Sequence, residues 1–217
     1  MTIEGLKLRV LKLRRKIFAK QRSKKLKNKD FTIISNNCWG GMTYESLNLP
    51  KQSPTVGMFF VASDFVKFCS DIPTYASTEI TIISAEESKH QEFIKEYFPN
   101  GINFPIGKIN DVELFFMHYH DAEIAKQTWE RRCARINYDK MIVKFNDQNG
   151  CTEEDLKNFI ALPLKNKFFF TCKFMDIDDP CVIRIKQLSK ADHIMVSNEP
   201  FGCHNKYLNI VKVINSL

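Results

Sequence analysis

The sequence lacks the long apolar runs and the short motifs by which several classes of protein are identified. No apolar segment approaches the roughly 18 residues of a membrane span, and the N-terminus lacks the apolar core of a signal peptide. Gly-x-Gly-x-x-Gly, Walker-type Gly-Lys-Ser/Thr, Cys-x-x-Cys and His-Glu-x-x-His are all missing. We therefore expect neither a membrane span nor a signal peptide, and the dinucleotide-binding and P-loop classes have no support.

Cysteine is too sparse for a disulfide framework. The chain has 7 Cys among 217 residues, an odd number that is scattered along the sequence, whereas secreted disulfide-rich proteins carry denser, paired cysteines. We expect free thiols in a reducing cytoplasm. Hydrophobic residues make up 44% and charged residues 26% of the chain, which is ordinary for a globular protein with one substantial core.

The excess of positive charge is confined to the N-terminal arm, residues 1–29. The arm carries 12 of the 32 Lys and Arg residues and one acidic residue, so its formal charge is +11, while residues 30–217 carry −4. The body offers no basic platform, and we expect no nucleic-acid partner. Apolar residues recur in the arm at helical spacing, namely Ile3, Leu6, Val10, Leu13 and Ile17.

A basic amphipathic helix of this kind has two interpretations. It can lie on an anionic membrane surface, which would make the protein cytoplasmic and peripheral on the inner leaflet of the membrane. Alternatively, its apolar stripe docks on the body of the protein or on a second subunit. The sequence leaves both interpretations open.

Strand-like and helix-like segments alternate from residue 30 onward. Apolar and β-branched runs predict strands at residues 31–35, 56–61, 79–83, 112–119, 141–145, 167–172 and 193–196. Helices are predicted between them, including a long one over residues 121–137 and one that begins with a capping box at Thr152. This order predicts an α/β fold of three layers, α/β/α, with a mainly parallel sheet. It would form a single domain over residues 30–217, preceded by the basic helix.

The most informative segment follows the first predicted strand. Small polar residues, one thiol, one indole and two glycines succeed the apolar run: Ser35, Asn36, Asn37, Cys38, Trp39, Gly40 and Gly41. Ser and Asn donate and accept hydrogen bonds, and glycine permits unusual backbone angles or a close ligand approach. His118, Asn146 and Asp147 end other predicted strands. Because the carboxyl ends of parallel strands share one edge, where ligands bind, we predict a pocket there.

Cys38 is a candidate nucleophile. It would lie near a helix N-terminus, where the thiolate is favoured, and His118 from another strand end would be its base. Asn37, Asn146 or Asp147 would orient that histidine or stabilise an oxyanion. The alternative is a buried structural cysteine.

Other residues indicate other chemistry. Asp147 would act as a base or bind sugar hydroxyls, unless it only forms a turn. Arg131 and Arg132, on the long helix, would pair with a phosphate or face solvent. His118 and His120 share a strand face but have no third ligand in the sequence pattern, so we predict no metal site.

Several blocks in a fixed order resemble one protein family. They are Ser35-Asn-Asn-Cys-Trp-Gly-Gly41, Ser53-Pro-Thr-Val-Gly57, Phe104-Pro-Ile-Gly-Lys108, Met117-His-Tyr119, Trp129-Glu-Arg-Arg132, Arg135-Ile-Asn137 and Lys144-Phe-Asn-Asp147. The chain resembles a bacterial domain family of unknown function, whose members are often labelled exopolysaccharide or capsule biosynthesis proteins and occasionally acetyltransferases. The resemblance covers about residues 30–205, and it implies an α/β domain in bacterial surface-polysaccharide synthesis.

We therefore expect a transferase in exopolysaccharide or capsule biosynthesis. It would act on an activated sugar or a lipid-linked glycan, with a carbohydrate or nucleotide sugar as substrate. His118 or Asp147 would be the base, and Arg131 or Arg132 would bind a phosphate. Two alternatives stay open: a cysteine-dependent hydrolase or acyltransferase that uses Cys38 and His118, and a non-catalytic glycan-binding or scaffold protein. The sequence does not identify a cofactor.

Overall fold

The part of the chain that the structure describes contains two β-sheets. The computed structural model describes residues 3–200 and 206–217. One sheet has four parallel strands in the order β1-β5-β6-β7, and the other has three antiparallel strands in the order β2-β3-β4. The strands are β1 (Thr32–Ser35), β2 (Thr81–Ile83), β3 (Ile106–Ile109), β4 (Val112–Phe115), β5 (Met141–Asn146), β6 (Lys167–Thr171) and β7 (Val182–Arg184). The helices are α1 (Ile3–Ile17), α2 (Ala19–Ser23), α3 (Trp39–Ser46), α4 (Ala62–Ser70), α5 (Ile72–Ser77), α6 (Gln91–Tyr97), α7 (Ala122–Cys133), α8 (Glu153–Ala161) and α9 (Ile210–Asn215), with short 3-10 turns η1 (Lys186–Leu188) and η2 (Val196–Asn198).

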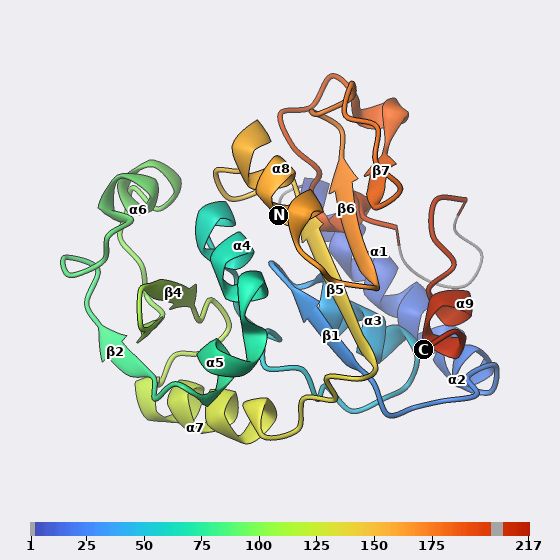
Figure 1. The fold of residues 1–217 in the computed structure, drawn as a ribbon, viewed down its shortest axis with the longest axis horizontal. Coiled ribbons are helices and arrows are strands. Elements are labelled where there is room, and N and C mark those ends of the chain that lie inside the picture. The colour runs from blue at the N-terminus through green and yellow to red at the C-terminus, as the bar shows by residue number, and fades with distance from the viewer. Residues whose placement is uncertain (1–2, 201–205) are drawn as a thin grey trace.

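Helices cover both faces of the parallel sheet (Figure 1). On one face Ile34, Val143 and Phe169 share a core with α4 and α8. On the other face Ile33 and Ile142 share a core with α3 and α9. Successive strand residues point to opposite faces, so each apolar run supplies both cores. The predicted three-layer α/β fold is confirmed.

The antiparallel sheet differs from the predicted strand arrangement. It is inserted in the chain between α3 and β5, and a turn at Asn110 (φ 51°) and Asp111 joins β3 to β4. A two-residue connection permits only antiparallel pairing, so residues 112–119 form β4 and a turn rather than a strand of the parallel sheet. Residues 56–61 make only a bridge from Phe59 to Phe115, and residues 193–196 contain no strand. The strands predicted at 56–61 and 193–196 were therefore wrong. The strands predicted at 79–83 and 112–119 are present as β2 and β4, but they lie in the antiparallel sheet.

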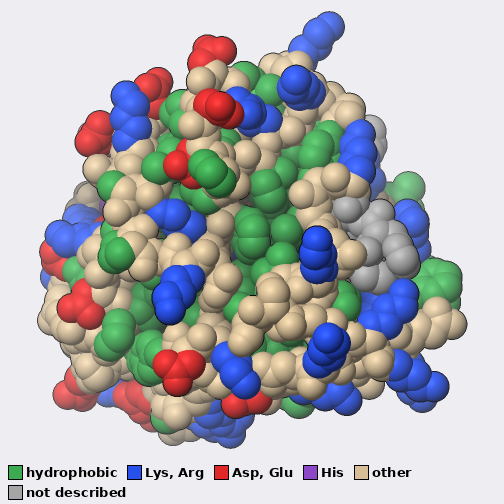
Figure 2. Space-filling view, turned by 45° about the vertical axis from the view of Figure 1, so that its right-hand side comes forward, with side chains coloured by type: hydrophobic (Ala, Val, Ile, Leu, Met, Phe, Trp, Pro, Cys, Tyr) green, Lys and Arg blue, Asp and Glu red, His purple; other side chains and the backbone are tan. Residues whose placement is uncertain are grey.

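The predicted N-terminal helix is confirmed, and it packs on α3 through the side opposite its apolar stripe. The buried Arg15 donates from Nε to Glu45 Oε2 at 3.0 Å, and Arg22 Nε donates to the Ser46 carbonyl at 2.6 Å. The apolar stripe of the arm is exposed, so docking of that stripe on the body is ruled out. Figure 2 shows Lys and Arg on both halves of this face, whereas Asp and Glu lie toward its left and centre, so the right-hand half carries only positive charge.

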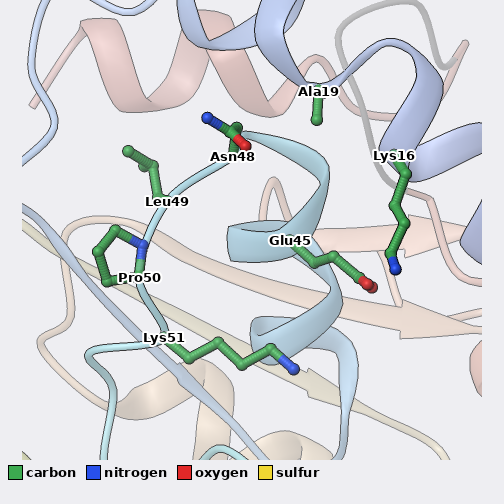
Figure 3. A pocket seen from close by; sticks show the side chains of 7 residues that line it. All are labelled: Lys16, Ala19, Glu45, Asn48, Leu49, Pro50 and Lys51. Carbon is green, nitrogen blue, oxygen red and sulfur yellow. The ribbon is translucent and has the colours of Figure 1, made fainter.

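An open groove lies between the arm and the segment that follows α3 (Figure 3). Its volume is about 530 Å³, and it is lined by Lys16, Ala19, Glu45 and residues 48–51. The Glu45 carboxylate is already paired with Arg15. The groove therefore presents the ammonium groups of Lys16 and Lys51, which favours anionic groups.

Candidate active site

Cys38 lies where β1 passes into α3, at the carboxyl edge of the parallel sheet. It is the N-cap residue of α3. Asn37 Oδ1 accepts hydrogen bonds from the Trp39 N–H at 3.1 Å and from the Ser35 hydroxyl at 3.3 Å, which satisfies one N–H that the helix start leaves without a carbonyl partner. Cys38 is half-buried, whereas the five other cysteines that the structure describes are buried. Cys38 is therefore the accessible thiol among them.

Two glycines allow α3 to pack closely on its neighbours. A Cβ on Gly40 would lie 3.3 Å from Ile33 Cγ2, and a Cβ on Gly41 would lie 3.0 Å from Val56 Cγ1. Neither glycine has a positive φ, so the unusual backbone angles that the sequence suggested are not used here. Because the glycines lack a side chain, the first turn of α3 can lie close to Ile33 in β1 and to Val56.

His118 reaches Cys38 from the antiparallel sheet. The chain turns after β4, and the His118 N–H donates to the Gly57 carbonyl at 3.1 Å. The exposed imidazole lies with Nε2 3.2 Å from Cys38 Sγ, which is hydrogen-bond distance for a thiol. We call this pair the Cys38–His118 dyad. The two sheets bring together residues that are 80 positions apart in the sequence.

A second set of contacts holds the turn that carries His118. Gly57 has φ +88°, and a Cβ there would lie 2.9 Å from the Tyr119 ring. Tyr119 donates its hydroxyl to the Val56 carbonyl at 3.2 Å. Arg132 Nη1 donates to the Val56 carbonyl and to the Tyr119 hydroxyl, each at 2.8 Å. Arg132, which we expected to bind a phosphate, is thus bonded to the segments that position His118.

Both members of the dyad are neutral near pH 7. Burial, and then the charge of Glu199, raise the pKa of the Cys38 thiol above its usual 9.0, and the charges of Lys144 and then Lys51 oppose this in part. Burial, and then the charge of Lys51, lower the pKa of His118 below its usual 6.5. The thiolate that a helix N-terminus favours is therefore not the resting form. A neutral imidazole is instead available to take the thiol proton.

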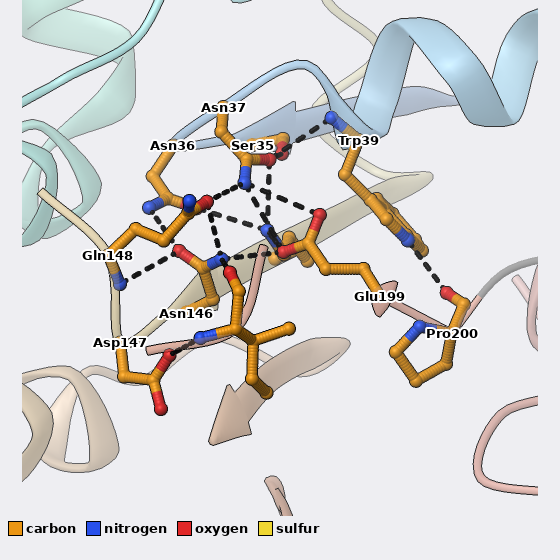
Figure 4. Close-up of polar contacts among 11 residues, drawn as sticks. Ser35, Asn36, Asn37, Trp39, Asn146, Asp147, Gln148, Glu199 and Pro200 are labelled. Atoms are coloured by element: carbon orange, nitrogen blue, oxygen red, sulfur yellow. Dashed lines mark hydrogen bonds and ion pairs between the residues drawn. The ribbon is translucent and has the colours of Figure 1, made fainter. Parts of the chain in front are cut away.

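A buried ion pair lies beneath the start of α3 (Figure 4). Lys144, in β5, and Glu199, just after η2, form a salt bridge between side chains that are both 0% exposed. Lys144 Nζ also donates to Asn36 Oδ1 at 3.2 Å and to Asn37 Oδ1 at 3.0 Å, and Asn146 Nδ2 donates to Glu199 Oε1 at 2.7 Å. Burial lowers the pKa of Lys144 and raises the pKa of Glu199, and their mutual attraction opposes both shifts.

The amides expected to line an open pocket are bonded to one another instead. Asn36 Nδ2 donates to Asn146 Oδ1 at 2.7 Å, and Asn37 Nδ2 donates to Gln148 Oε1 at 2.9 Å. Ser35, Asn36 and Asn146 are fully buried. The structure therefore brings these side chains together at the sheet edge, but as a buried support rather than as a lining.

Sequence reasoning missed Lys144 and Glu199. The available signal was a lysine in the apolar strand β5, because a strand covered on both faces buries its side chains and a buried ammonium group needs a counter-charge. Nothing in the sequence identified Glu199 as that partner, since 55 positions separate the two residues.

The Asp147 carboxylate is an acceptor for the backbone around it. Oδ2 accepts from the Thr171 hydroxyl at 2.9 Å and the Cys172 N–H at 2.7 Å, and Oδ1 accepts from the Ile194 N–H at 2.7 Å. The side chain is buried. Both oxygens are thus occupied in joining the ends of β5 and β6 to the segment before η2, which leaves little scope for Asp147 as a base.

The remaining predicted residues make no hydrogen bond with Cys38 or His118 in the described part of the chain. Trp39 is buried, and its indole N–H donates to the Pro200 carbonyl at 2.7 Å. Arg131 is exposed, with Nη2 3.4 Å from the Thr128 hydroxyl, and His120 is exposed. Within residues 3–200 and 206–217, no group of three His, Cys, Asp or Glu side chains is placed to hold a metal ion.

Comparison with known proteins identifies the family to which this sequence is similar. The sequence profile of a family described as "Domain of unknown function (DUF1919)" matches residues 9–217. A Haemophilus influenzae protein named "Uncharacterized protein" is 33% identical over 150 residues, which are 69% of this chain and 66% of that protein, just under two thirds of its length. The expected family of unknown function is thereby confirmed. The match begins inside α1, so it extends further into the arm than the resemblance did.

Proposed function

The chain belongs to the DUF1919 family, and for this member we propose a cysteine-dependent acyltransferase or hydrolase with Cys38 as nucleophile and His118 as base. The observation that carries the proposal is the 3.2 Å contact between Cys38 Sγ and His118 Nε2. A nucleophile and a base within hydrogen-bond reach form the arrangement that covalent catalysis requires. The half-buried position of the thiol at a helix N-terminus adds to this support.

The proposed reaction has two steps. Cys38 Sγ attacks the carbonyl carbon of an ester or thioester, while His118 Nε2 takes the thiol proton. The bond to the leaving group then breaks, the proton passes from His118 to that group, and the acyl group stays on Cys38 as a thioester. Water or an acceptor hydroxyl next attacks the thioester, with His118 taking its proton and returning it to the departing Cys38 sulfur.

The start of α3 favours this chemistry. The first N–H groups of a helix have no carbonyl partner within it, and the helix dipole places positive potential there. The Trp39 N–H already donates to Asn37 Oδ1, so the N–H groups that follow it in the first turn would stabilise the oxyanion that forms when Cys38 attacks the carbonyl. We assign this role to the first turn of α3, which Gly40 and Gly41 hold against β1 and Val56.

The acceptor decides between hydrolysis and transfer. The resemblance to exopolysaccharide and capsule proteins favours a carbohydrate hydroxyl, free or on a lipid-linked glycan, and Lys16 and Lys51 in the groove favour an anionic donor. Direct transfer of an activated sugar has less support, because Asp147, one of the two bases expected for it, has both oxygens occupied, while His118 lies against Cys38.

The proposal is tested with p-nitrophenyl acetate as acyl donor. We expect the wild-type protein to release a burst of about one equivalent of p-nitrophenolate, as an acyl-enzyme accumulates. Cys38→Ser should show no burst, whereas Cys133→Ser, which removes a buried thiol, should keep it. An equal burst from Cys38→Ser would show that the acetyl group is taken up elsewhere, and a non-catalytic binding protein would then be favoured.

The burst rate should depend on pH through His118. Because its pKa is lowered below 6.5, the imidazole is neutral at pH 7 and becomes protonated only on the acid side of 6.5, where it can no longer accept the thiol proton. We expect a flat rate from neutral pH up to 9.0, loss of rate below 6.5, and a further rise above 9.0 as the thiolate forms. Stopped-flow measurement of p-nitrophenolate release checks this. A rate that stays constant well below pH 6.5 would indicate a resting thiolate–imidazolium pair instead.

A further inference from the structure

The helix α1 exposes an apolar stripe to solvent. The stripe consists of Leu6, Val10, Leu13 and Ile17, which are 51%, 50%, 63% and 67% exposed. At about 100° per residue they fall in one narrow row along the helix. We call this row the outer stripe. Large apolar side chains that are exposed in one contiguous row mark an interaction surface more strongly than scattered ones do.

The outer stripe cannot fold back onto the body, because the opposite side of α1 is already docked. Leu8 and Leu11 are half-buried and Arg15 is 5% exposed. Arg15 is paired with Glu45 and also contacts the Met42 sulfur at 3.2 Å. Turning the stripe inward would break this partly buried ion pair, so α1 offers one face to α3 and the other to an external partner.

Basic side chains border the outer stripe on both sides. By the helical geometry, Lys7 and Arg14 lie along one border and Arg9 and Lys16 along the other. All four are exposed, and residues 1–29 carry a formal charge of +11. An apolar row between two basic rows matches a surface that is apolar inside and anionic at its boundary.

We propose that α1 binds the surface of an anionic lipid bilayer. The helix would lie in the plane of the interface, with the outer stripe in the acyl boundary and the Lys and Arg side chains against the phosphate headgroups. A second copy of the chain is a poorer partner, because it would place two strongly basic arms against each other. Among the described residues no helix is long and apolar enough to cross a membrane, so the binding is to the surface. This proposal is independent of the chemistry at Cys38.

The test is co-sedimentation of the full chain with vesicles. We expect binding to vesicles of phosphatidylglycerol and phosphatidylcholine, loss of binding at high salt, and little binding to phosphatidylcholine alone. Leu13→Gln/Ile17→Gln should weaken binding about tenfold or more, and each of Lys7→Gln and Arg14→Gln about fivefold. The control Ile124→Gln, at an exposed position of α7, should bind like wild type.

Three results would overturn the proposal. The first is equal binding by Leu13→Gln/Ile17→Gln and Ile124→Gln, and the second is no binding by wild type. The third is a wild-type dimer in analytical ultracentrifugation that becomes monomeric in Leu13→Gln/Ile17→Gln, which would assign the outer stripe to a second copy. The substituted positions are exposed, so an unchanged urea midpoint will show that each variant is folded.

Discussion

Replacing Lys144 with methionine is expected to lower the free energy of unfolding by about 3–5 kcal/mol, because one partner of a buried ion pair is left uncompensated. The Glu199 side chain is 0% exposed in its salt bridge with Lys144, so it would stay in the interior without a counter-charge. Asn36 and Asn37 would lose the same ammonium donor from their Oδ1 atoms. Urea unfolding followed by the fluorescence of the two buried tryptophans measures the loss.

Two further variants separate the buried charge from other effects. Lys157→Met is the matched control, because Lys157 forms an exposed i,i+4 pair with Glu153 at 2.8 Å, and such pairs contribute less than about 1 kcal/mol. Lys144→Met/Glu199→Leu removes both buried charges and should regain much of the lost stability. A cost for Lys144→Met no larger than that for Lys157→Met would show that the buried pair does not stabilise the fold.

The buried pair is also linked to the dyad. Asn37 joins Lys144 to the first turn of α3 through its Oδ1, which accepts from both Lys144 Nζ and the Trp39 N–H. The Glu199 charge raises the pKa of the Cys38 thiol. The Lys144 charge lowers the same pKa, so the two charges oppose each other there. The ion pair therefore supports the position of Cys38 through Asn37, rather than its protonation state.

Replacing His118 with alanine is expected to slow acylation of Cys38 by about 10²–10⁴-fold, the usual contribution of a general base. The reason is that the Cys38 thiol is protonated at neutral pH and loses the neighbour that takes its proton. The burst rate with p-nitrophenyl acetate measures the effect. Partial rescue by added imidazole would separate a lost base from a displaced turn.

His120→Ala is the matched control for this substitution. His120 is exposed, lies two positions from His118 and makes no hydrogen bond to Cys38 in the described part of the chain. We expect its burst rate to stay close to that of wild type. Equal rates for the two alanine variants would mean that His118 is not the base.

The parallel sheet could be predicted because apolar strand-like runs and helical segments alternate along the sequence. The capping box at Thr152 is present as predicted, with the side chains of Thr152 and Asp155 each accepting from the other residue's backbone N–H. The convergence of Asn36, Asn37 and Asn146 also follows from parallel strands sharing one edge. These features depend on local pattern, which a single sequence contains.

The antiparallel sheet could not be predicted in the same way, because the apolar pattern of a strand does not determine which other strand it pairs with. Residues 112–119 read as a buried strand whichever sheet they join, and only the short connection at Asn110 and Asp111 indicates a hairpin with β3. The sequence did place Cys38 and His118 together as candidates, but for a reason that the structure replaces. The histidine comes from the antiparallel sheet, held by Gly57 and Arg132 contacts, and not from the edge of the parallel sheet.

The most direct measurement is to locate the acetyl group after the burst. The wild-type protein is quenched in acid after reaction with p-nitrophenyl acetate, digested, and mapped by mass spectrometry for acetylated residues. We expect one acetyl group, on the peptide that contains Cys38, and its absence from that peptide in His118→Ala quenched at the same time. An acetyl group on lysines or on another cysteine, with Cys38 unmodified, would contradict the assignment of Cys38 and His118 as the reactive pair.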